Sequence, residues 1–372
     1  MRIAFLVLII LHGLIHFLGF LKGFGIADIK ELSLTISKPV GLIWLATGLL
    51  FLVYGISWWT GYKFSWLLAF IAVVVSQVLV ILYWKDAKAA TLPNLIILVV
   101  AIVSLGSYNF NKMVQTDTNR ILYGNKVVNE KVVSKKDLEG LPQPVQKWLR
   151  HSGIIGKPFI SNGKILQDLK MKMKPGQEKW LQATAVQYST VDVPAFIWSV
   201  DARMNSLIGF KGRDKFEGGK GEMLIKLEGL VNVVDEKGEK LDEGSLQRYL
   251  GEMVWLPTLA LSPHVSWEEV NDCTAIATLD YMGTKGSGTF TFNSDGDFTI
   301  FSAMRFKGNE ADAKRYPWVL KVQEHKSFED IRVPSKMTAT WKLENQDWTW
   351  LKLDIKNIDY NVKAPVKNSK KI

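Results

Sequence analysis

Four long apolar segments at the start of the 372-residue chain constrain its fold more than any other feature. They occupy residues 3–20, 40–59, 64–84 and 92–110. Each has about 18–21 residues, enough for a helix to cross a hydrocarbon core about 30 Å thick. Trp58, Trp59 and Trp84 lie at segment ends, where aromatic side chains favour the membrane interface. The sequence therefore predicts a four-span transmembrane domain over residues 1–112, with the lipid bilayer as its first partner.

The loops between these segments predict an orientation in the membrane. The first and third loops carry the basic residues Lys22, Lys30, Lys38, Lys85 and Lys88. The opposite side carries Arg2 and Lys63, although further basic residues follow the last segment. Because positively charged loops stay in the cytoplasm, we expect a multi-pass protein of the cytoplasmic membrane with its large domain outside.

The net charge argues against a nucleic-acid partner, and the cysteine content excludes an intrachain disulfide. The formal net charge is +10, a mild excess over so long a chain. It suits an anionic membrane surface better than a nucleic-acid groove, so no nucleic-acid partner is expected. Cys273 is the only cysteine, so an intrachain disulfide is impossible.

The polar residues inside the apolar segments include His12, His16, Gln77 and Asn94. Ionisable groups at membrane depth are candidates for function. The alternative is that neutral imidazoles hydrogen-bond Ser76, Gln77 or Asn94 and hold the helices together, and we favour this alternative. No third histidine is present in this half of the membrane to support haem ligation.

The rest of the chain predicts a β domain behind a polar connector. Residues 113–140 have no long apolar face and are interpreted as a linker. Residues 141–362 begin with a short helix and continue with alternating apolar and polar positions, as at Met223, Ile225 and Leu227. About a dozen antiparallel strands would form a curved sheet or half-barrel. Residues 363–372 form a basic tail.

One helical stretch, residues 242–261, interrupts the strands. Leu246, Tyr249, Leu250, Met253 and Val254 follow the spacing of one helical face. A single apolar helix within a β domain must cover a sheet face, as a core element or as a lid over a cavity. The predicted fold class is therefore a membrane-anchored α+β protein, a four-helix transmembrane bundle followed by a mainly antiparallel half-barrel with inserted helices.

The sequence contains no convincing catalytic set. Standard hydrolase, metalloprotease, redox and nucleotide-binding motifs are absent, so no metal or cofactor is predicted. Glycine-rich residues 218–221 and 283–288 do not open helices and are interpreted as hairpin turns. Residues 293–297 have oxygen ligands but lack the glycine and closing glutamate of a calcium loop, so they too are a turn.

The candidate ligand-binding residues lie on and after the central helix. They are Arg248, Tyr249, Glu252, Trp255 and Trp267. The plain interpretation is an ion pair between positions i and i+4, with the aromatic residues in the core. The functional interpretation makes Arg248 the anchor for an anionic head group and Glu252 a carboxylate with a raised pKa. His264 follows closely, whereas His151 and His325 are read as isolated.

Several stretches together resemble a family of uncharacterised bacterial integral membrane proteins. The matching stretches are LHGLIHFLGF (11–20), GLIWLATGLL (41–50), SQVLVILYWKDAKAATLPNLIIL (76–98), LPQPVQKWLRHSG (141–153) and QRYLGEMVWLPTLAL (247–261), leading to Trp267. The resemblance implies a four-span anchor with a β domain and implies no activity. The element order is also similar to the lipoprotein-carrier half-barrels of bacterial envelopes, which bind acyl chains under their helices.

These observations leave three functions open. The first is a membrane-anchored module that holds a lipid or other apolar ligand, with the central helix as cover and Arg248 near the opening. The second is an envelope enzyme that acts on lipid or cell-wall material through Glu252, Arg248 and His264. The third is a membrane scaffold for a protein partner.

Overall fold

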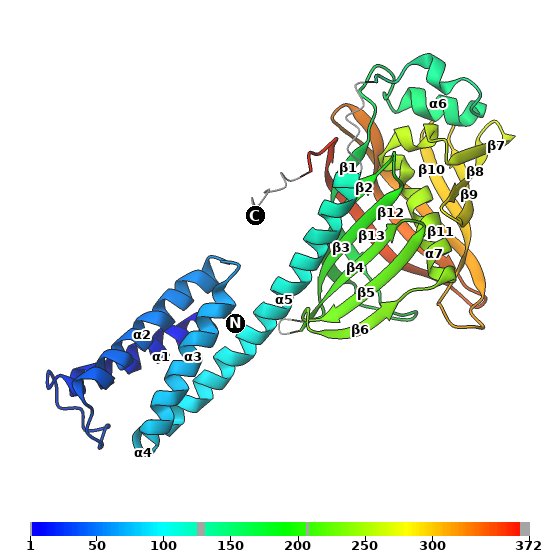
Figure 1. Ribbon diagram of the computed structural model, residues 1–372. Helices are drawn as coiled ribbons and strands as arrows, with labels where there is room; N and C mark the ends of the chain where they lie inside the picture. Colours follow the sequence, from blue (N-terminus) through cyan, green and yellow to red (C-terminus); the bar gives the residue numbers. More distant parts are fainter. Residues whose placement is uncertain (1, 125–130, 206–207, 365–372) are drawn as a thin grey trace. The chain divides into compact units, whose positions relative to one another are not determined.

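A computed structural model of the chain describes residues 2–124, 131–205 and 208–364 (Figure 1). These residues form two compact units. The first unit holds Met1–Asn111 with Glu228–Leu230, and the second begins at Lys112 and holds the other described residues. Residues 125–130 of the predicted linker and residues 365–372 of the predicted tail lie outside the described residues.

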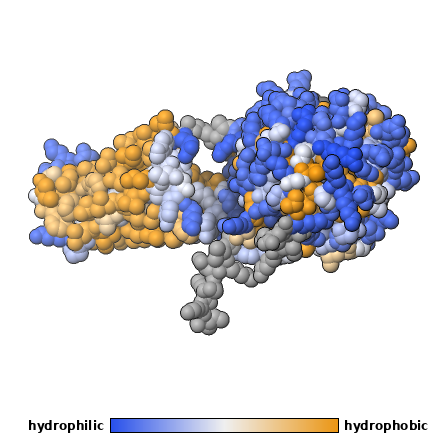
Figure 2. Space-filling model, turned by 90° about the horizontal axis from the view of Figure 1, so that it is seen from above, coloured by the Kyte–Doolittle hydropathy of each residue, from blue (hydrophilic) through white to orange (hydrophobic). Residues whose placement is uncertain are grey.

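The first unit contains the predicted apolar helices. They are α1 (Arg2–Gly23), α2 (Lys38–Trp59), α3 (Ser65–Leu82) and α5 (Thr91–Gly124), with the short α4 (Trp84–Ala87) and η1 (Lys88–Ala90) before α5. By length and composition, four helices can cross a membrane. Figure 2 shows a largely hydrophobic surface over this helical part. Such a surface is consistent with a membrane protein, because a water-exposed bundle would bury its apolar side chains.

The polar residues of the apolar helices meet inside the helix bundle. His12 Nε2 lies 2.8 Å from Asn94 Oδ1, and His16 Nε2 lies 2.9 Å from Ser76 Oγ. Asn94 Nδ2 donates to Ser76 Oγ at 2.9 Å and to Gln77 Oε1 at 3.0 Å. The predicted hydrogen bonds are therefore present, and they join α1, α3 and α5.

Helix α5 extends beyond the apolar segment that the sequence predicts. Residues 113–124, interpreted as linker, continue the helix to Gly124. In the second unit, Ile121 and Leu122 pack with Ala195 and Ile197 of the sheet. A few apolar residues are enough to hold this part of the helix, because they pack against apolar residues of the sheet. The sequence of the helix alone does not reveal that contact.

The second unit is built on one antiparallel sheet, strongly curved into a half-barrel (Figure 1). Before it come η2 (Lys135–Leu138) and α6 (Gln143–His151). The first strands are β1 (Asn162–Met171), β2 (Leu181–Thr190), β3 (Ala195–Arg203), β4 (Gly209–Glu217), β5 (Lys220–Leu227) and β6 (Val231–Glu236). The later strands are β7 (Val265–Asn271), β8 (Thr274–Tyr281), β9 (Thr284–Phe292), β10 (Phe298–Phe306), β11 (Arg315–Phe328), β12 (Ile331–Lys342) and β13 (Asp347–Tyr360).

The strand order explains the position of the central helix. The order is β6-β5-β4-β3-β2-β1-β13-β12-β11-β10-β9-β8-β7. Strands β1 to β6 therefore extend from the centre of the sheet to one edge. The chain then crosses to the other edge, and strands β7 to β13 lead back to the centre, where β13 pairs with β1. The crossing consists of α7 (Glu239–Gly251), η3 (Glu252–Trp255) and η4 (Pro257–Leu261).

This crossing segment fills the inside of the half-barrel. Leu246, Leu250, Met253 and Val254 are fully buried within the main apolar core of the second unit. The predicted helix is present but ends at Gly251, and Pro257 begins η4 because its fixed φ suits a first helical position. The predicted fold class is confirmed as apolar helices followed by a curved antiparallel sheet with inserted helices.

Candidate functional site

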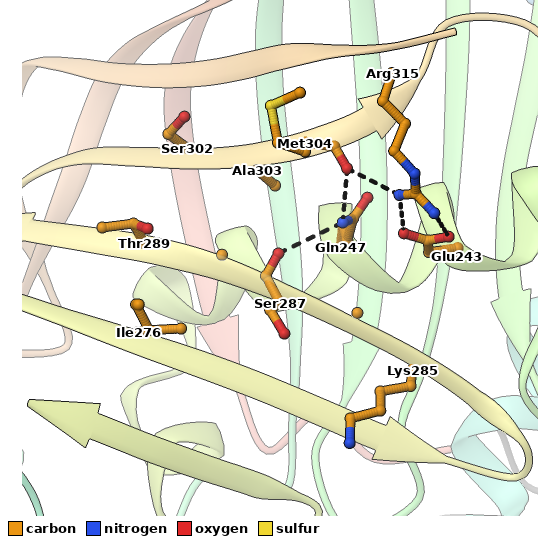
Figure 3. Close-up of a pocket in the computed structure, with 12 residues that line it drawn as sticks. Glu243, Gln247, Ile276, Lys285, Ser287, Thr289, Ser302, Ala303, Met304 and Arg315 are labelled. Carbon is orange, nitrogen blue, oxygen red and sulfur yellow. Dashed lines mark hydrogen bonds and ion pairs between the residues drawn. The ribbon is translucent and has the colours of Figure 1, made fainter. Parts of the chain in front are cut away.

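An open pocket lies where strands β9 and β10 separate (Figure 3). Their pairing runs from Phe298 opposite Phe292 to Ser302 opposite Thr289 and is not continued beyond that pair. From there, β9 stays paired with β8 and β10 stays paired with β11. The pocket has a volume of about 610 Å³.

Two glycines of β9 allow α7 to press against the sheet at this split. A Cβ atom added to Gly288 would lie 2.2 Å from the ring of Phe301, and one added to Gly286 would lie 2.8 Å from Gln247 Cγ. Residues 283–288 were predicted to be a turn. The turn is shorter than predicted, because β9 begins at Thr284 and Gly286 lies within the strand, where its missing side chain leaves room for α7.

Gln247 of α7 forms the floor of the pocket between the two strands (Figure 3). Its Nε2 donates to the backbone oxygen of Met304 at 3.1 Å and, more weakly, to that of Ser287 at 3.4 Å. Its Oε1 is buried and has no hydrogen-bond partner among the described residues. Gln247 is only 3% exposed, so this oxygen is a buried acceptor whose hydrogen-bonding capacity is not used by the described residues.

The rim of the pocket is rich in cations and hydroxyl groups. Arg315 holds Glu243 with both guanidinium ends, one of them at 2.7 Å. Arg315 donates these hydrogen bonds to the Glu243 carboxylate, and they raise the pKa of Arg315. Lys285 is exposed on the opposite strand, and Ser287 Oγ lies 2.7 Å from Thr278 Oγ1. Each of the two cations therefore has a carboxylate beside it, because Glu243 binds Arg315 and Asp280 Oδ2 lies 4.0 Å from Lys285 Nζ.

The next residue of α7, Arg248, enters a separate network on the inside of the half-barrel. Its Nε donates to Glu252 Oε1 at 2.9 Å and its Nη1 to Asp214 Oδ2 at 2.7 Å. Gln187 donates to the other Glu252 oxygen at 2.7 Å. The guanidinium lies 4.8 Å from the ring centre of Trp198. The predicted pair between Arg248 and Glu252 is present, and here both partners bind other protein groups as well.

Burial acts on the charges of this network. It raises the pKa of the Asp214 carboxyl, and the Arg248 cation counteracts that rise. Arg305 of β10 lies nearby and stacks 4.2 Å above Trp318. Burial and the Arg248 cation lower the pKa of Arg305 to about 9, which still leaves it charged at neutral pH.

The three aromatic candidates from the sequence do not line the pocket. Tyr249 is buried and its hydroxyl donates to the Thr190 backbone oxygen. Trp255 donates through Nε1 to the Pro334 oxygen, and Trp267 donates to the Ala260 oxygen, both at 3.0 Å. Tyr249 and Trp255 thus lie in the core of the second unit, and the partly buried Trp267 packs against that core.

The histidines of the second unit are arranged differently from the prediction. His151 and His325 were read as isolated, but their Nε2 atoms lie 3.3 and 3.8 Å from Asp297 Oδ1. Arg332 holds the same carboxylate at 2.8 and 3.0 Å, and these hydrogen bonds lower the pKa of Asp297. These residues are far apart in the sequence, so the sequence alone does not show that the fold brings them together.

No acid–base set or metal site emerges from these side chains. His264 packs against Tyr281, and none of its described contacts joins it to Glu252. In the part of the chain that the structure describes, no group of three or more His, Cys, Asp or Glu side chains is arranged to hold a metal ion.

The sequence analysis missed Glu243, Gln247, Ser287 and Arg315. The alternation of Gly286, Ser287 and Gly288 in a strand next to a helix was the available signal, since glycine in a strand marks a close approach.

Comparisons with known proteins give a family and a weak structural likeness. The model of the Family of unknown function (DUF6544) matches residues 131–353. No curated protein matches the chain. Among solved structures, the crystal structure of LolA superfamily protein NE2245 from Nitrosomonas europaea is 8% identical. The match covers 58% of this chain and 92% of that chain, with a TM-score of 0.33.

Proposed function

The chain belongs to the Family of unknown function DUF6544, and we propose that it is a membrane-anchored module that binds an amphiphile with an anionic head group. The observation that carries the proposal is the open pocket between β9 and β10. Its volume of about 610 Å³ lies within the range usual for small-molecule sites.

The side chains around the pocket support a ligand of this chemical class. Arg315 and Lys285 supply positive charge, and Ser287 offers a hydroxyl group. The buried Oε1 of Gln247 favours a ligand that also carries a hydrogen-bond donor, such as a hydroxyl. Met304, which is exposed, offers an apolar contact for the aliphatic part of the ligand.

This location differs from the predicted site under the central helix. The apolar side chains of α7 and η3 are sealed in the core, so an apolar ligand there would have to displace them. The pocket lies instead beside the polar residues Glu243 and Gln247 of α7. The alternative of an envelope enzyme gains no support, since Glu252 is held by Arg248 and Gln187.

A pair of substitutions on one strand tests the proposal. Thr289 and Thr291 lie on the same face of β9, and of the two only Thr289 lines the pocket. We expect the full-length protein in detergent to bind dihexanoyl phosphatidylglycerol saturably, measured by calorimetry, and dihexanoyl phosphatidylcholine much more weakly. Thr289→Trp should fill the pocket and weaken binding about tenfold, which corresponds to about 1.4 kcal/mol.

Thr291→Trp is the matched control, because non-specific binding to the apolar helices is the same in both variants. Equal binding by the Thr289→Trp and Thr291→Trp proteins, or no saturable binding at all, would contradict the proposal.

A further inference from the structure

Large apolar side chains are exposed at neighbouring hairpin ends of the sheet. Met173 is 44% exposed after β1, Met204 and Ile208 are 53% and 41% exposed between β3 and β4, and Val231 is 61% exposed at the start of β6. Strands β1 to β6 are consecutive antiparallel neighbours. Their first, third and fifth connections therefore emerge at the same end of the sheet. We call Met173, Met204, Ile208 and Val231 the apolar tips.

Basic residues accompany the apolar tips. Lys172 and Lys174 flank Met173, and Arg203 precedes Met204. The connections at the same end in the other half of the sheet are different in character. The β10–β11 connection carries Glu310 and Asp312, and none of its residues is an exposed large hydrophobic one. The β8–β9 connection carries one exposed apolar residue, Met282, so several apolar residues together with basic ones are found only on the described connections of β1 to β6.

The part of α5 that belongs to the second unit, from Lys112 to Gly124, packs against the sheet. In the second unit, Asp117 pairs with Arg213 of β4, and Arg120 pairs with Glu217, four residues further along β4. The helix therefore runs beside β4 in the same direction as that strand. Because β4 begins at the β3–β4 connection, the residues that precede Asp117 lead back toward the apolar tips.

We propose that this end of the half-barrel rests on an anionic lipid surface. The four apolar helices would tether the sheet at a bilayer, which keeps the tips within reach of it. Met173, Met204, Ile208 and Val231 insert among the lipid head groups, where partly buried apolar side chains are stabilised. Lys172, Lys174 and Arg203 attract anionic lipids. This surface does not include the pocket between β9 and β10, so it holds whether or not that pocket binds a ligand.

Fluorescent probes on the full chain test the surface. In a Cys273→Ser background, an environment-sensitive fluorophore is attached at Met173→Cys or Met204→Cys. The control is Val193→Cys on the β2–β3 connection, since Val193 is 41% exposed but lies at the opposite end of the sheet. Each protein is reconstituted into vesicles of equal parts phosphatidylglycerol and phosphatidylcholine.

We expect doxyl-labelled lipid to quench the probes at positions 173 and 204 but not at 193, with iodide showing the reverse pattern. Met204→Asp should reduce lipid quenching of a probe at 173, because it places a charge at the interface. Equal iodide quenching at all three positions would overturn the proposal. Protection at 173 and 204 from both quenchers would overturn it as well and would indicate a protein or a second copy on this surface.

Discussion

Replacing Arg248 by methionine is the most informative test of how the inside of the half-barrel is stabilised. Arg248 lies between the carboxylates of Asp214 and Glu252 and donates to both. Methionine keeps much of the side-chain volume against Trp198 but removes the charge. Two buried carboxylates then face one another without a cation between them.

The magnitude follows from the loss of one partner in a buried ionic network. Such a loss typically costs about 3–5 kcal/mol, because the remaining charges stay desolvated and unpaired. For a unit of this size, 1 kcal/mol corresponds to roughly 2–4 °C in the midpoint of thermal unfolding. We therefore expect Arg248→Met to lower the midpoint by about 10 °C at pH 8.

The loss should depend on pH in a definite direction. Burial already raises the pKa of Asp214 in the folded protein, and Arg248 opposes this rise. Without Arg248, the folded-state pKa of Asp214 moves further above its unfolded value. A carboxyl whose pKa is raised by folding destabilises the folded state when the pH is high enough to ionise it. The destabilisation disappears below the pKa of the unfolded state, about 4, where the carboxyl is protonated in both states. The difference between variant and parent should therefore shrink as the pH falls from 8 to 5.

Near-ultraviolet circular dichroism of the detergent-solubilised protein measures the unfolding at both pH values. Arg150→Met is the control, because Arg150 is exposed and bonds only the Gln146 side chain among its described contacts. Adding Asp214→Asn and Glu252→Gln to Arg248→Met should recover most of the lost stability. A deficit for Arg248→Met that is equal at pH 5 and pH 8, or smaller than 1 °C, would refute this reasoning.

Three further substitutions have definite expected outcomes. Gly288→Val should prevent stable folding, measured by circular dichroism, because even a Cβ atom would lie 2.2 Å from the Phe301 ring. Asp297→Asn should destabilise by about 1–2 kcal/mol at pH 7, because Asp297 binds Arg332. Since the folded pKa of Asp297 is lowered, that deficit should vanish as acid protonates the parent carboxyl. Asn94→Ala should lower resistance to unfolding by sodium dodecyl sulfate by about 0.6–2 kcal/mol.

Each of these substitutions has a matched control. Gly124→Val should fold, because among the described residues outside its own helical turn none has an atom within 4 Å of the added Cβ. Asp312→Asn changes an exposed carboxylate and should leave stability unchanged at every pH. Ser104→Ala removes a bond to the backbone of its own helix and should affect the bundle less than Asn94→Ala. A control that loses as much stability as its partner would contradict the corresponding assignment.

Local patterns predicted the architecture because each element obeys its own periodicity. Runs of apolar residues predicted the four long helices, and period-two alternation predicted the curved antiparallel sheet. The spacing of Leu246, Leu250 and Met253 predicted a helix on the inner face. These features depend on neighbours a few residues away, so a single sequence contains them.

The candidate site could not be predicted because it depends on contacts between distant segments. Gln247 bonds Met304, 57 positions away, and Arg213 bonds Asp117, 96 positions away. The β9–β10 pairing ends where Gln247 of α7 bonds the backbone of both strands. The glycines of β9 indicate a close approach to that strand, but β9 and β10 alone do not reveal that α7 is the approaching element.

The arrangement of α7 decides which of its side chains can serve a ligand. Its apolar face is sealed against the sheet, and Arg248 is held by two carboxylates. Glu243 and Gln247 line the pocket, and Gln247 keeps a buried oxygen without a described partner. A ligand in the pocket would satisfy that oxygen without moving the core. From this arrangement we expect Thr289→Trp to weaken binding without changing the near-ultraviolet circular dichroism of the core. A lid mechanism would require α7 to move when the ligand binds, and the near-ultraviolet signal would then change.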